Sequence, residues 1–259
     1  MDIRALFDLT GKTAIVTGAS KGIGKAIALG LAQAGAQVVV SSRNQEAVDE
    51  VATELRTAGH RAQGIACHVG DKDQLASLVQ QTNGHFGPVD ILVNNAATNP
   101  FFGPIEELDM GAFQKTMNIN LEAAILLSNL VYPQMKASGE GSIIHISSIE
   151  GIHASALFSA YNVSKAALIM LTKNQAAEWG KDKVRVNVIC PGFVKTKLSK
   201  MLWSNENVHN RLIEKIPLGR MAEPEEMAGL AVFLASKASS YMTGSTLVQD
   251  GGLLNGPIL

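Results

Sequence analysis

The sequence of 259 residues has little cysteine, few aromatic residues and almost no excess charge. Its two cysteines, Cys67 and Cys190, are too few for a disulfide framework and form no CxxC pair, so we expect both to be small buried residues. Lys and Arg number 22 and Asp and Glu 23, which gives a net charge of −1. Because binding to nucleic acid or to an anionic membrane needs a basic excess on one face, this balance argues against both partners.

Long apolar runs and metal-ligand spacings are also missing. No stretch approaches the roughly 18 consecutive apolar residues of a membrane span. The N-terminus, MDIRALFDLTGK, has charged residues among its apolar ones and lacks the core of a signal peptide. We therefore expect a cytoplasmic protein. The histidines show no H-x-x-x-H, H-E-x-x-H or Cys/His spacing, so no metal site is expected.

The sequence does contain a regular alternation of short β-branched runs and longer amphipathic segments. The expected strands are 12–18, 36–42, 89–95, 141–148, 184–191 and 245–250. A helix is expected to begin after Asn44 and to end at Gly59, because its apolar residues have helical spacing. The alternation predicts a single α/β domain over 1–259, a doubly wound Rossmann-type fold with a mostly parallel sheet and helices on both faces.

A glycine-rich turn, TGASKGIG, follows the first expected strand and precedes a helix. Glycines there let the backbone approach a pyrophosphate, and the positive end of the helix stabilises its charge. The spacing is G-x-x-x-G-x-G, which differs from the common G-x-G-x-x-G fingerprint. An ordinary tight turn is the alternative, but the position between strand and helix favours a dinucleotide site. Its candidate residues are Gly18, Ser20, Lys21, Gly22, Ile23 and Gly24.

The end of the second expected strand bears on the choice of dinucleotide. A carboxylate there normally binds the ribose hydroxyls of NAD, whereas a basic residue accommodates the 2′-phosphate of NADP. The sequence has Ser42 and Arg43 at this point and no acid, with Lys21 as a second cation. The alternative is that Arg43 is only a solvated residue at the start of a helix. The charge-assisted hydrogen bonds that the two cations can make to a phosphate favour NADP(H).

A candidate catalytic pair lies in the segment YNVSK. Tyr161 and Lys165 are four residues apart and would share one face of a helix, where the cation would lower the pKa of the phenol. The pentapeptide alone is equally typical of a surface Tyr beside a solvated Lys. However, Ser148 ends an expected strand thirteen residues earlier, at the sheet edge where α/β proteins bind ligands. Its hydroxyl could hydrogen-bond a carbonyl oxygen that gains negative charge.

Together these motifs resemble the short-chain dehydrogenase/reductase family over essentially the whole chain. TGASKGIG, VNNAA, Ser148, YNVSK and PGFVKT match the family's motifs in order. The resemblance implies that Tyr161 is the general acid/base, that Lys165 tunes it and holds the nicotinamide ribose, and that Ser148 polarises the carbonyl. It also implies that Asn120, preferred to Asn118, kinks its helix and holds a relay water. Further cofactor contacts implied by the resemblance are Asn95, Ala96, Pro191, Gly192, Val194 and Thr196.

The sequence departs from the family pattern at two positions. Ala97 replaces the last glycine of NNAG, and His68, followed by Val69, stands where the family usually has an aspartate that contacts adenine. Both His68 and Val69 remain candidate cofactor contacts. CHVG, the NNAA segment with NPFFG, and MLW particularly resemble carbonyl reductases of the dehydrogenase/reductase member 4 type.

The expected reaction is hydride transfer between NADP(H) and a small-molecule carbonyl or secondary alcohol, with Tyr161 as the general acid. The segment 193–217 resembles a substrate lid, and its Met201, Leu202 and Trp203 suit an apolar ketone or aldehyde; a core-packing stripe is the alternative. A 3-oxoacyl-[acyl-carrier-protein] reductase shares the same motifs. A nucleotide-binding protein without catalysis is a further alternative. The resemblance also implies a homotetramer.

Overall fold

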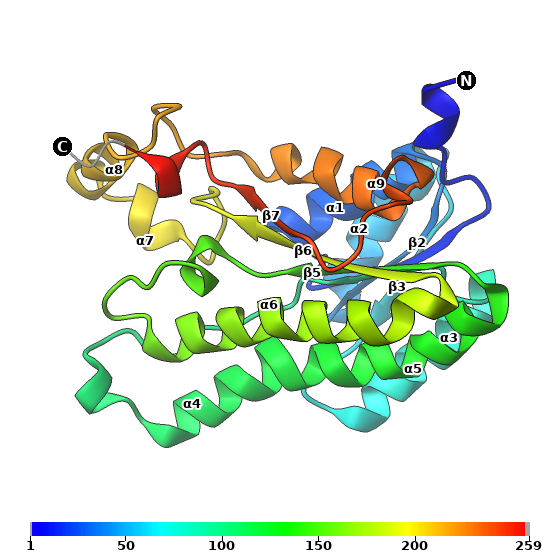
Figure 1. Cartoon of the computed structure of the whole chain (residues 1–259), viewed down its shortest axis with the longest axis horizontal. Helices are drawn as coiled ribbons and strands as arrows, with labels where there is room; N and C mark the ends of the chain where they lie inside the picture. Colours follow the sequence, from blue (N-terminus) through cyan, green and yellow to red (C-terminus); the bar gives the residue numbers. More distant parts are fainter. Residues whose placement is uncertain (1, 257–259) are drawn as a thin grey trace.

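The computed structural model describes residues 2–256 and contains one seven-stranded sheet in the order β3-β2-β1-β4-β5-β6-β7 (Figure 1). Every neighbouring pair of strands is parallel, which confirms the predicted doubly wound α/β fold. The strands are β1 (Thr13–Thr17), β2 (Gln37–Ser42), β3 (Ala62–Ala66), β4 (Ile91–Asn94), β5 (Gly141–Ile146), β6 (Val184–Pro191) and β7 (Thr246–Gln249).

Helices cover both faces of the sheet, because side chains alternate along each buried strand. In β2, Val38 and Val40 join one apolar cluster and Val39 joins the other. The first cluster includes residues of α1 (Gly22–Gln33), α2 (Gln45–Thr57) and α9 (Ala228–Ala235). The second includes residues of α3 (Lys72–Phe86), α5 (Ala123–Ser138) and α6 (Ser159–Trp179). Figure 1 shows the two helical layers above and below the strands.

The edge strand β3 was not predicted, because its sequence AQGIA contains a glycine and a glutamine instead of a β-branched run. Packing explains the glycine. A Cβ on Gly64 would lie 2.6 Å from a carboxylate oxygen of Asp49 and 2.8 Å from the main chain of Val48. The close approach of α2 therefore selects a residue of low β-propensity at this position.

The predicted limits of α2 are confirmed. The Asn44 side chain accepts a hydrogen bond from the Ala47 N–H and caps the first turn. At the other end Gly59 has a φ of +88°, a conformation that suits glycine just beyond a helix. Between them, the apolar stripe of Val48, Val51, Ala52 and Leu55 is buried. The helix thus fixes the position of β2 and of the residues that follow it.

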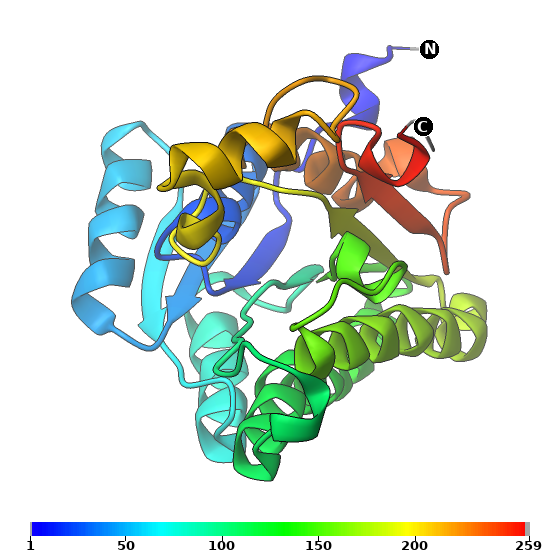
Figure 2. The same cartoon turned by 90° about the vertical axis from the view of Figure 1, so that its left-hand side faces the viewer.

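The strand order reverses between β1 and β4, and ligands of doubly wound sheets bind at the carboxyl ends of strands beside such a reversal. Figure 2 looks onto this edge, where α7 (Lys200–Trp203) and α8 (Glu206–Ile213) lie above the strand ends. α4 (Met110–Met117) lies below them. Within residues 2–256, no helix combines the length and the apolar character needed to cross a bilayer.

Candidate active site

The glycine-rich turn connects β1 to α1 and leaves no room for a side chain at Gly18 or Gly24. Gly18 and Gly22 have φ values of +64° and +57°, in the left-handed region that favours glycine. A Cβ on Gly18 would lie 2.9 Å from the Cα of Ala96, and one on Gly24 would lie 2.5 Å from the Gly18 carbonyl oxygen. The glycines therefore let the turn pack tightly against the end of β4. The turn forms a cradle at the N-terminus of α1, whose N–H groups and positive dipole end suit the pyrophosphate of a dinucleotide.

Hydrogen bonds of Asn95 hold this turn against the end of β4. Its side-chain amide donates hydrogen bonds to the carbonyl oxygens of Thr17 at 2.8 Å and Gly18 at 3.2 Å. The Thr17 hydroxyl in turn accepts from the N–H groups of Asn95 and Ala96. Both amide hydrogens of Asn95 are used within the protein, so its side chain holds the shape of the cradle.

The end of β2 lies beside the same turn. The Ala19 N–H donates to the Ser41 carbonyl at 2.9 Å, and Thr17 is the register partner of Ser41. Ser42 and Arg43 follow directly, so the structure brings the end of β2 next to the turn that carries Lys21. Lys21 and Arg43 are both exposed. This arrangement offers two cations to a phosphate beyond the cradle.

The segment after β6 closes the other side of the site. A Cβ on Gly22 would lie 3.3 Å from the methyl group of Thr196, which puts this segment against the glycine turn. Trp203 in α7 donates its indole N–H to the Thr196 carbonyl at 3.1 Å. The N–H of Gly192 donates to the Gln249 carbonyl, Val194 is buried, and Pro191 ends β6. The structure therefore brings the predicted cofactor contacts that follow β6 next to the glycine-rich turn.

Ser148 lies just beyond β5 and accepts a hydrogen bond from the Glu150 N–H at 3.1 Å. Its hydroxyl hydrogen remains available to a neighbouring oxygen. Glu150 itself is buried and accepts hydrogen bonds from the N–H and hydroxyl of Ser155. This pairing shapes the chain between Ser148 and Tyr161, and no sequence motif indicated it.

Tyr161 and Lys165 are in α6, and the Lys165 ammonium lies 5.5 Å from the centre of the Tyr161 ring. Lys165 is almost completely buried and donates to the Ile146 carbonyl at 2.7 Å. Burial lowers the pKa of Lys165 to about 8. Burial also raises the pKa of the Tyr161 phenol to about 12; the Ser148 hydroxyl opposes this shift and Glu150 adds to it.

The direction of the Tyr161 shift corrects our expectation that Lys165 would lower this pKa. Loss of water around the phenol disfavours the phenolate more than its neighbours stabilise it. At neutral pH the phenol is therefore protonated and the ammonium is mostly charged. A protonated phenol beside the Ser148 hydroxyl can donate a proton to an oxygen that becomes negative.

Asn120 is 2% exposed and lies in a π-helical turn over Asn118–Glu122, between α4 and α5. Its amide donates to the Thr98 carbonyl and to the Ser164 hydroxyl, both at 3.0 Å, and its Oδ1 accepts from the Thr98 N–H. The Ser164 hydroxyl donates to the Tyr161 carbonyl at 2.7 Å. Asn120 therefore links the segment after β4, which contains Thr98, to α6, the helix of Tyr161. Sequence reasoning missed Thr98 and Ser164, although Ser164 lies within YNVSK.

The competing residue Asn118 makes different contacts. Its amide donates to a Glu122 carboxylate oxygen at 3.3 Å, and its Oδ1 lies 2.4 Å from a Cβ placed on Gly70. Nearby, His68 accepts the Gly70 N–H on Nδ1 at 3.2 Å. Val69, Ala96 and Asn120 line a small crevice beside Thr17. These contacts connect Asn118 to the His68 segment and Asn120 to the Tyr161 helix.

Behind the candidate site, His145 in β5 is fully buried. Asn94 donates to its Nδ1 at 3.2 Å, so the ring proton is on Nε2 and reaches Gln175 Oε1 at 2.9 Å. Burial lowers the pKa of His145 from 6.5 to about 4, and the charge of Lys165 acts in the same direction. The neutral imidazole thus holds together β4, β5 and α6.

We predict that His145 makes the fold sensitive to acid. Because its folded pKa lies below the unfolded value, its contribution to stability is complete above pH 6.5 and decreases as the pH falls towards 4. Between pH 7 and pH 5 this amounts to about 2 kcal/mol of unfolding free energy. Urea unfolding of the wild type and His145→Gln at both pH values measures it. The exposed His85→Gln is the control; equal pH slopes for all three proteins would contradict the prediction.

Comparison with known proteins relates this arrangement to a large family. Residues 18–254 match a family model described as enoyl-(acyl carrier protein) reductase. The chain is 44% identical over 244 residues to the human dehydrogenase/reductase SDR family member 4, covering 94% of this chain and 88% of that protein.

Solved structures of other proteins are also similar to this chain in fold and sequence. A putative NAD(P)-dependent gluconate 5-dehydrogenase from Beutenbergia cavernae, with bound NADP, has a TM-score of 0.92 and 39% identity over 97% of this chain and 100% of that one. A 3-oxoacyl (acyl-carrier-protein) reductase from Agrobacterium tumefaciens, with NADP bound, has a TM-score of 0.91 and 32% identity over 97% of both chains. The chain therefore belongs to the short-chain dehydrogenase/reductase family and is a nicotinamide-dependent oxidoreductase that acts on CH–OH or C=O groups.

Proposed function

We propose that the protein is an NADP(H)-dependent reductase of ketones or aldehydes that carry an apolar or aromatic flank. The observation that carries this proposal is the aromatic group beside Tyr161. The Phe158 ring centre lies 6.5 Å from that of Tyr161, and Phe102 packs edge-on against Phe158 at 4.9 Å. Phe102 remains 52% exposed. An apolar surface of this kind next to a proton donor suits an apolar carbonyl compound.

The choice of NADP(H) rests on the end of β2. Lys21 and Arg43 offer two cations where a 2′-phosphate would lie, and Ser42 replaces the acid typical of NAD sites. The two related structures described above contain NADP. The glycine-rich turn suits the pyrophosphate because the N-cap residue Lys21 provides no side-chain cap to α1, so the N–H groups of the first helical turn can bind the phosphates. Lys165, Pro191, Val194 and Thr196 would hold the nicotinamide end.

When bound, NADPH supplies the hydride for carbonyl reduction. The protein's own groups then stabilise and neutralise the charge that develops on the substrate oxygen. The Ser148 hydroxyl donates a hydrogen bond to this oxygen, and the protonated Tyr161 phenol gives it a proton. The charged Lys165 lies near the phenolate that remains and stabilises it. Asn120 positions the Tyr161 helix through Ser164 and has an Oδ1 lone pair for a relay water.

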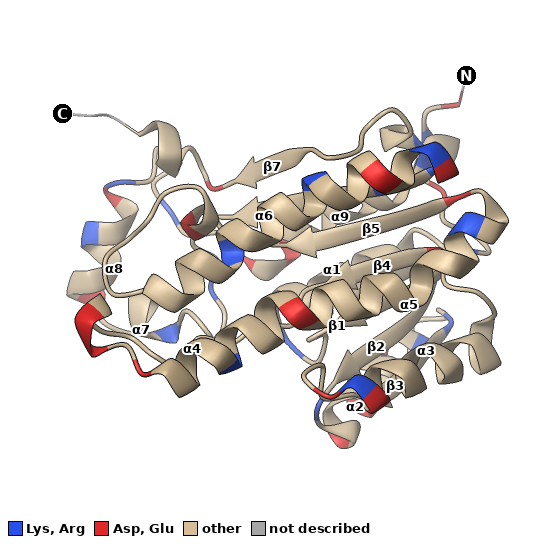
Figure 3. Ribbon diagram, turned by 60° about the horizontal axis from the view of Figure 1, so that its bottom comes forward, with Lys and Arg blue, Asp and Glu red and all other residues tan. Residues whose placement is uncertain are grey.

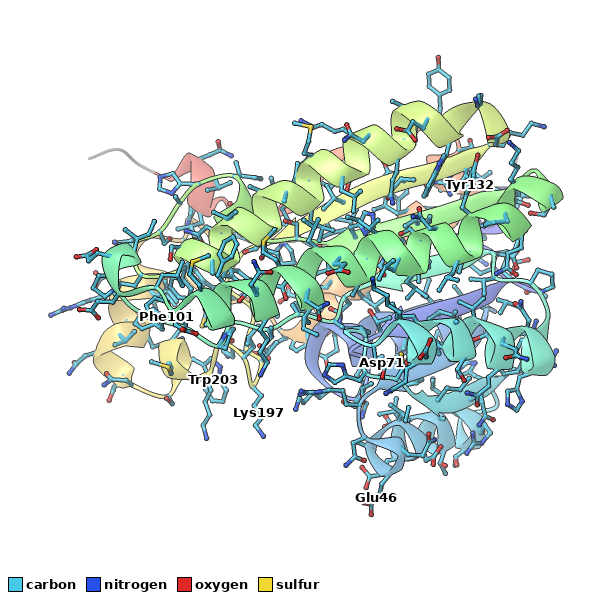
Figure 4. All side chains as sticks on the ribbon, turned by 90° about the horizontal axis from the view of Figure 1, so that it is seen from below. Glu46, Asp71, Phe101, Tyr132, Lys197 and Trp203 are labelled. Atoms are coloured by element: carbon cyan, nitrogen blue, oxygen red, sulfur yellow. The ribbon has the colours of Figure 1, made fainter. Side chains whose placement is uncertain are left out.

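The segment 193–217 is proposed as the substrate lid. Met201 is 71% exposed and Trp203 is 36% exposed, which supports a lid over a core-packing stripe. Figure 4 shows Trp203 and Lys197 of this segment at the same end of the molecule as Phe101. The indole hydrogen bond to Thr196 attaches α7 to the cofactor side of the site. An apolar substrate would cover the exposed lid residues when the segment closes.

The test is a panel of carbonyl substrates measured with NADPH and with NADH. We expect turnover of aromatic ketones, aldehydes or diketones with NADPH, and weaker turnover of small polar ketones. Acyl-carrier-protein and small 3-oxoacyl thioesters, compared across salt concentrations, test the carrier-protein alternative, because docking of an acidic carrier weakens with salt. The absence of NADPH turnover on every aromatic ketone, diketone and thioester would remove the proposal.

We further propose a homotetramer that uses α5 and α6. These helices lie side by side (Figure 3), and Leu130, Val163 and Met170 expose apolar side chains on them. Within Ala123–Ser138 the only charged residue is Lys136. Such a surface is typical of a subunit contact. Light scattering should give a mass near four times 27.4 kDa, and a stable monomer at micromolar concentration would contradict the proposal.

A further inference from the structure

A cavity of about 500 Å³ lies at the amino ends of the strands, on the side of the sheet opposite the candidate active site. Its lining includes Ile91, Gly141 and Val184, which are the first residues of β4, β5 and β6, whereas the catalytic residues follow the carboxyl ends of these strands. Figure 4 places Tyr132, whose ring stacks on Trp179 beside this lining, at the opposite end of the molecule from Phe101. The cavity is therefore separate from the cofactor and substrate sites.

Positive charge is concentrated in this cavity, although the whole chain is nearly neutral. The lining contains four cations, Lys12, Lys183, Arg185 and Lys237, and two carboxylates, Asp90 and Glu140. The two carboxylates share one cation: Lys12 lies 2.7 Å from Glu140 and 3.5 Å from Asp90. The other three cations form no ion pair with any carboxylate of residues 2–256. The lining thus has a net charge of +2.

Arg185 gives this charge a fixed position. It is half-buried in β6, and its guanidinium donates to the Ser239 hydroxyl at 2.8 Å and to the Ser236 carbonyl at 3.2 Å. Both acceptors are neutral, and a guanidinium has five N–H donors. Glu140 of the same lining attracts Arg185 through space but forms no ion pair with it, so an anion bound at the guanidinium would offset part of the cost of burying this cation. The two serine contacts use two of the five N–H donors and restrain the planar group within the lining.

We propose that this cavity binds a small organic anion that carries carboxylate or phosphate groups. The fork of Arg185 binds one such group in a bidentate manner, and Lys183 and Lys237 balance a second charge. Met242, which is half-buried and also in the lining, provides apolar surface for the body of the ligand. The volume lies in the range of small-molecule sites. Because the site is remote from Tyr161, it is independent of the reaction proposed above.

Calorimetric titration of the NADP⁺-saturated enzyme tests the proposal, since bound cofactor occupies Lys21 and Arg43. The probes are citrate, which carries only carboxylates, and inorganic pyrophosphate, which carries only phosphates. We expect saturable one-to-one binding of at least one probe, and the stronger probe identifies the group that the site prefers. Arg185→Met should weaken this binding by at least about 10-fold, because charge-assisted hydrogen bonds are lost.

Two further variants make the test specific. Lys237→Met leaves the guanidinium and its serine contacts intact and should weaken binding by about 3-fold to 10-fold. Lys181→Met removes an exposed cation two residues from Lys183 that is not part of the lining, and should change binding less than about 2-fold. No saturable binding of either probe at about 10 mM would overturn the proposal. Equal weakening by Lys181→Met would also overturn it, because general surface attraction would then explain the binding.

Discussion

Tyr161→Phe should lower kcat for carbonyl reduction by about 1,000-fold or more and leave the Kd for NADPH within about 2-fold of the wild-type value. The change removes one hydroxyl from a half-buried side chain whose pKa of about 12 keeps it protonated at neutral pH. Without it, no acid remains to neutralise the substrate oxygen after hydride transfer. The ring, its contact with Phe158 and the position of Lys165 are retained. Stopped-flow or steady-state kinetics measure kcat, and fluorescence titration measures NADPH binding.

Tyr241→Phe is the matched control for this prediction. Tyr241 is fully exposed and lines the cavity at the other edge of the sheet, so the loss of its hydroxyl should leave kcat unchanged. Unchanged turnover in Tyr161→Phe would mean that the assigned acid is wrong. A wild-type protein that binds NADPH but reduces no substrate of the panel would instead favour the non-catalytic nucleotide-binding alternative.

Some parts of the fold and site were predictable because they depend on local chemistry. The cradle requires glycines with positive φ, so Gly18 and Gly22 reveal it in the sequence. The helical spacing of Tyr161 and Lys165 likewise follows from four residues of separation. Asn44 and Gly59 marked the ends of α2 through capping preferences that act within a few residues.

Other parts depend on contacts between distant segments, which a single sequence does not display. Gly64 is required in β3 because Asp49 of α2 packs against it. Since glycine is rare in strands, the sequence did not indicate a strand here. The hydrogen bonds that connect Thr98, Asn120 and Ser164 join residues 22 and 44 positions apart. The pKa of Tyr161 is raised, opposite to expectation, because burial, which is a property of the whole fold, outweighs the hydrogen bond with the Ser148 hydroxyl. Spacing identified Tyr161 and Lys165 as candidates, and tertiary packing determines their protonation.

Cofactor preference should reverse in Arg43→Asp. We expect kcat/KM for NADPH to fall by about 100-fold and kcat/KM for NADH to rise by about 10-fold. Arg43 is exposed just after β2, next to the turn that carries Lys21. An aspartate there repels the 2′-phosphate of NADPH and accepts hydrogen bonds from the free ribose hydroxyls of NADH. Initial rates with both cofactors at one carbonyl substrate measure the change.

Two companion variants separate the physical causes of this reversal. Arg43→Met removes the attraction without adding repulsion, so NADPH should lose only about 10-fold in kcat/KM and NADH should gain little. Arg61→Asp makes the same change of charge just before β3, at the opposite edge of the sheet, and should leave the preference unchanged. If Arg43→Asp still prefers NADPH as strongly as the wild type does, Arg43 does not contact the 2′-phosphate. If Arg61→Asp shifts the preference equally, net charge rather than a local contact selects the cofactor.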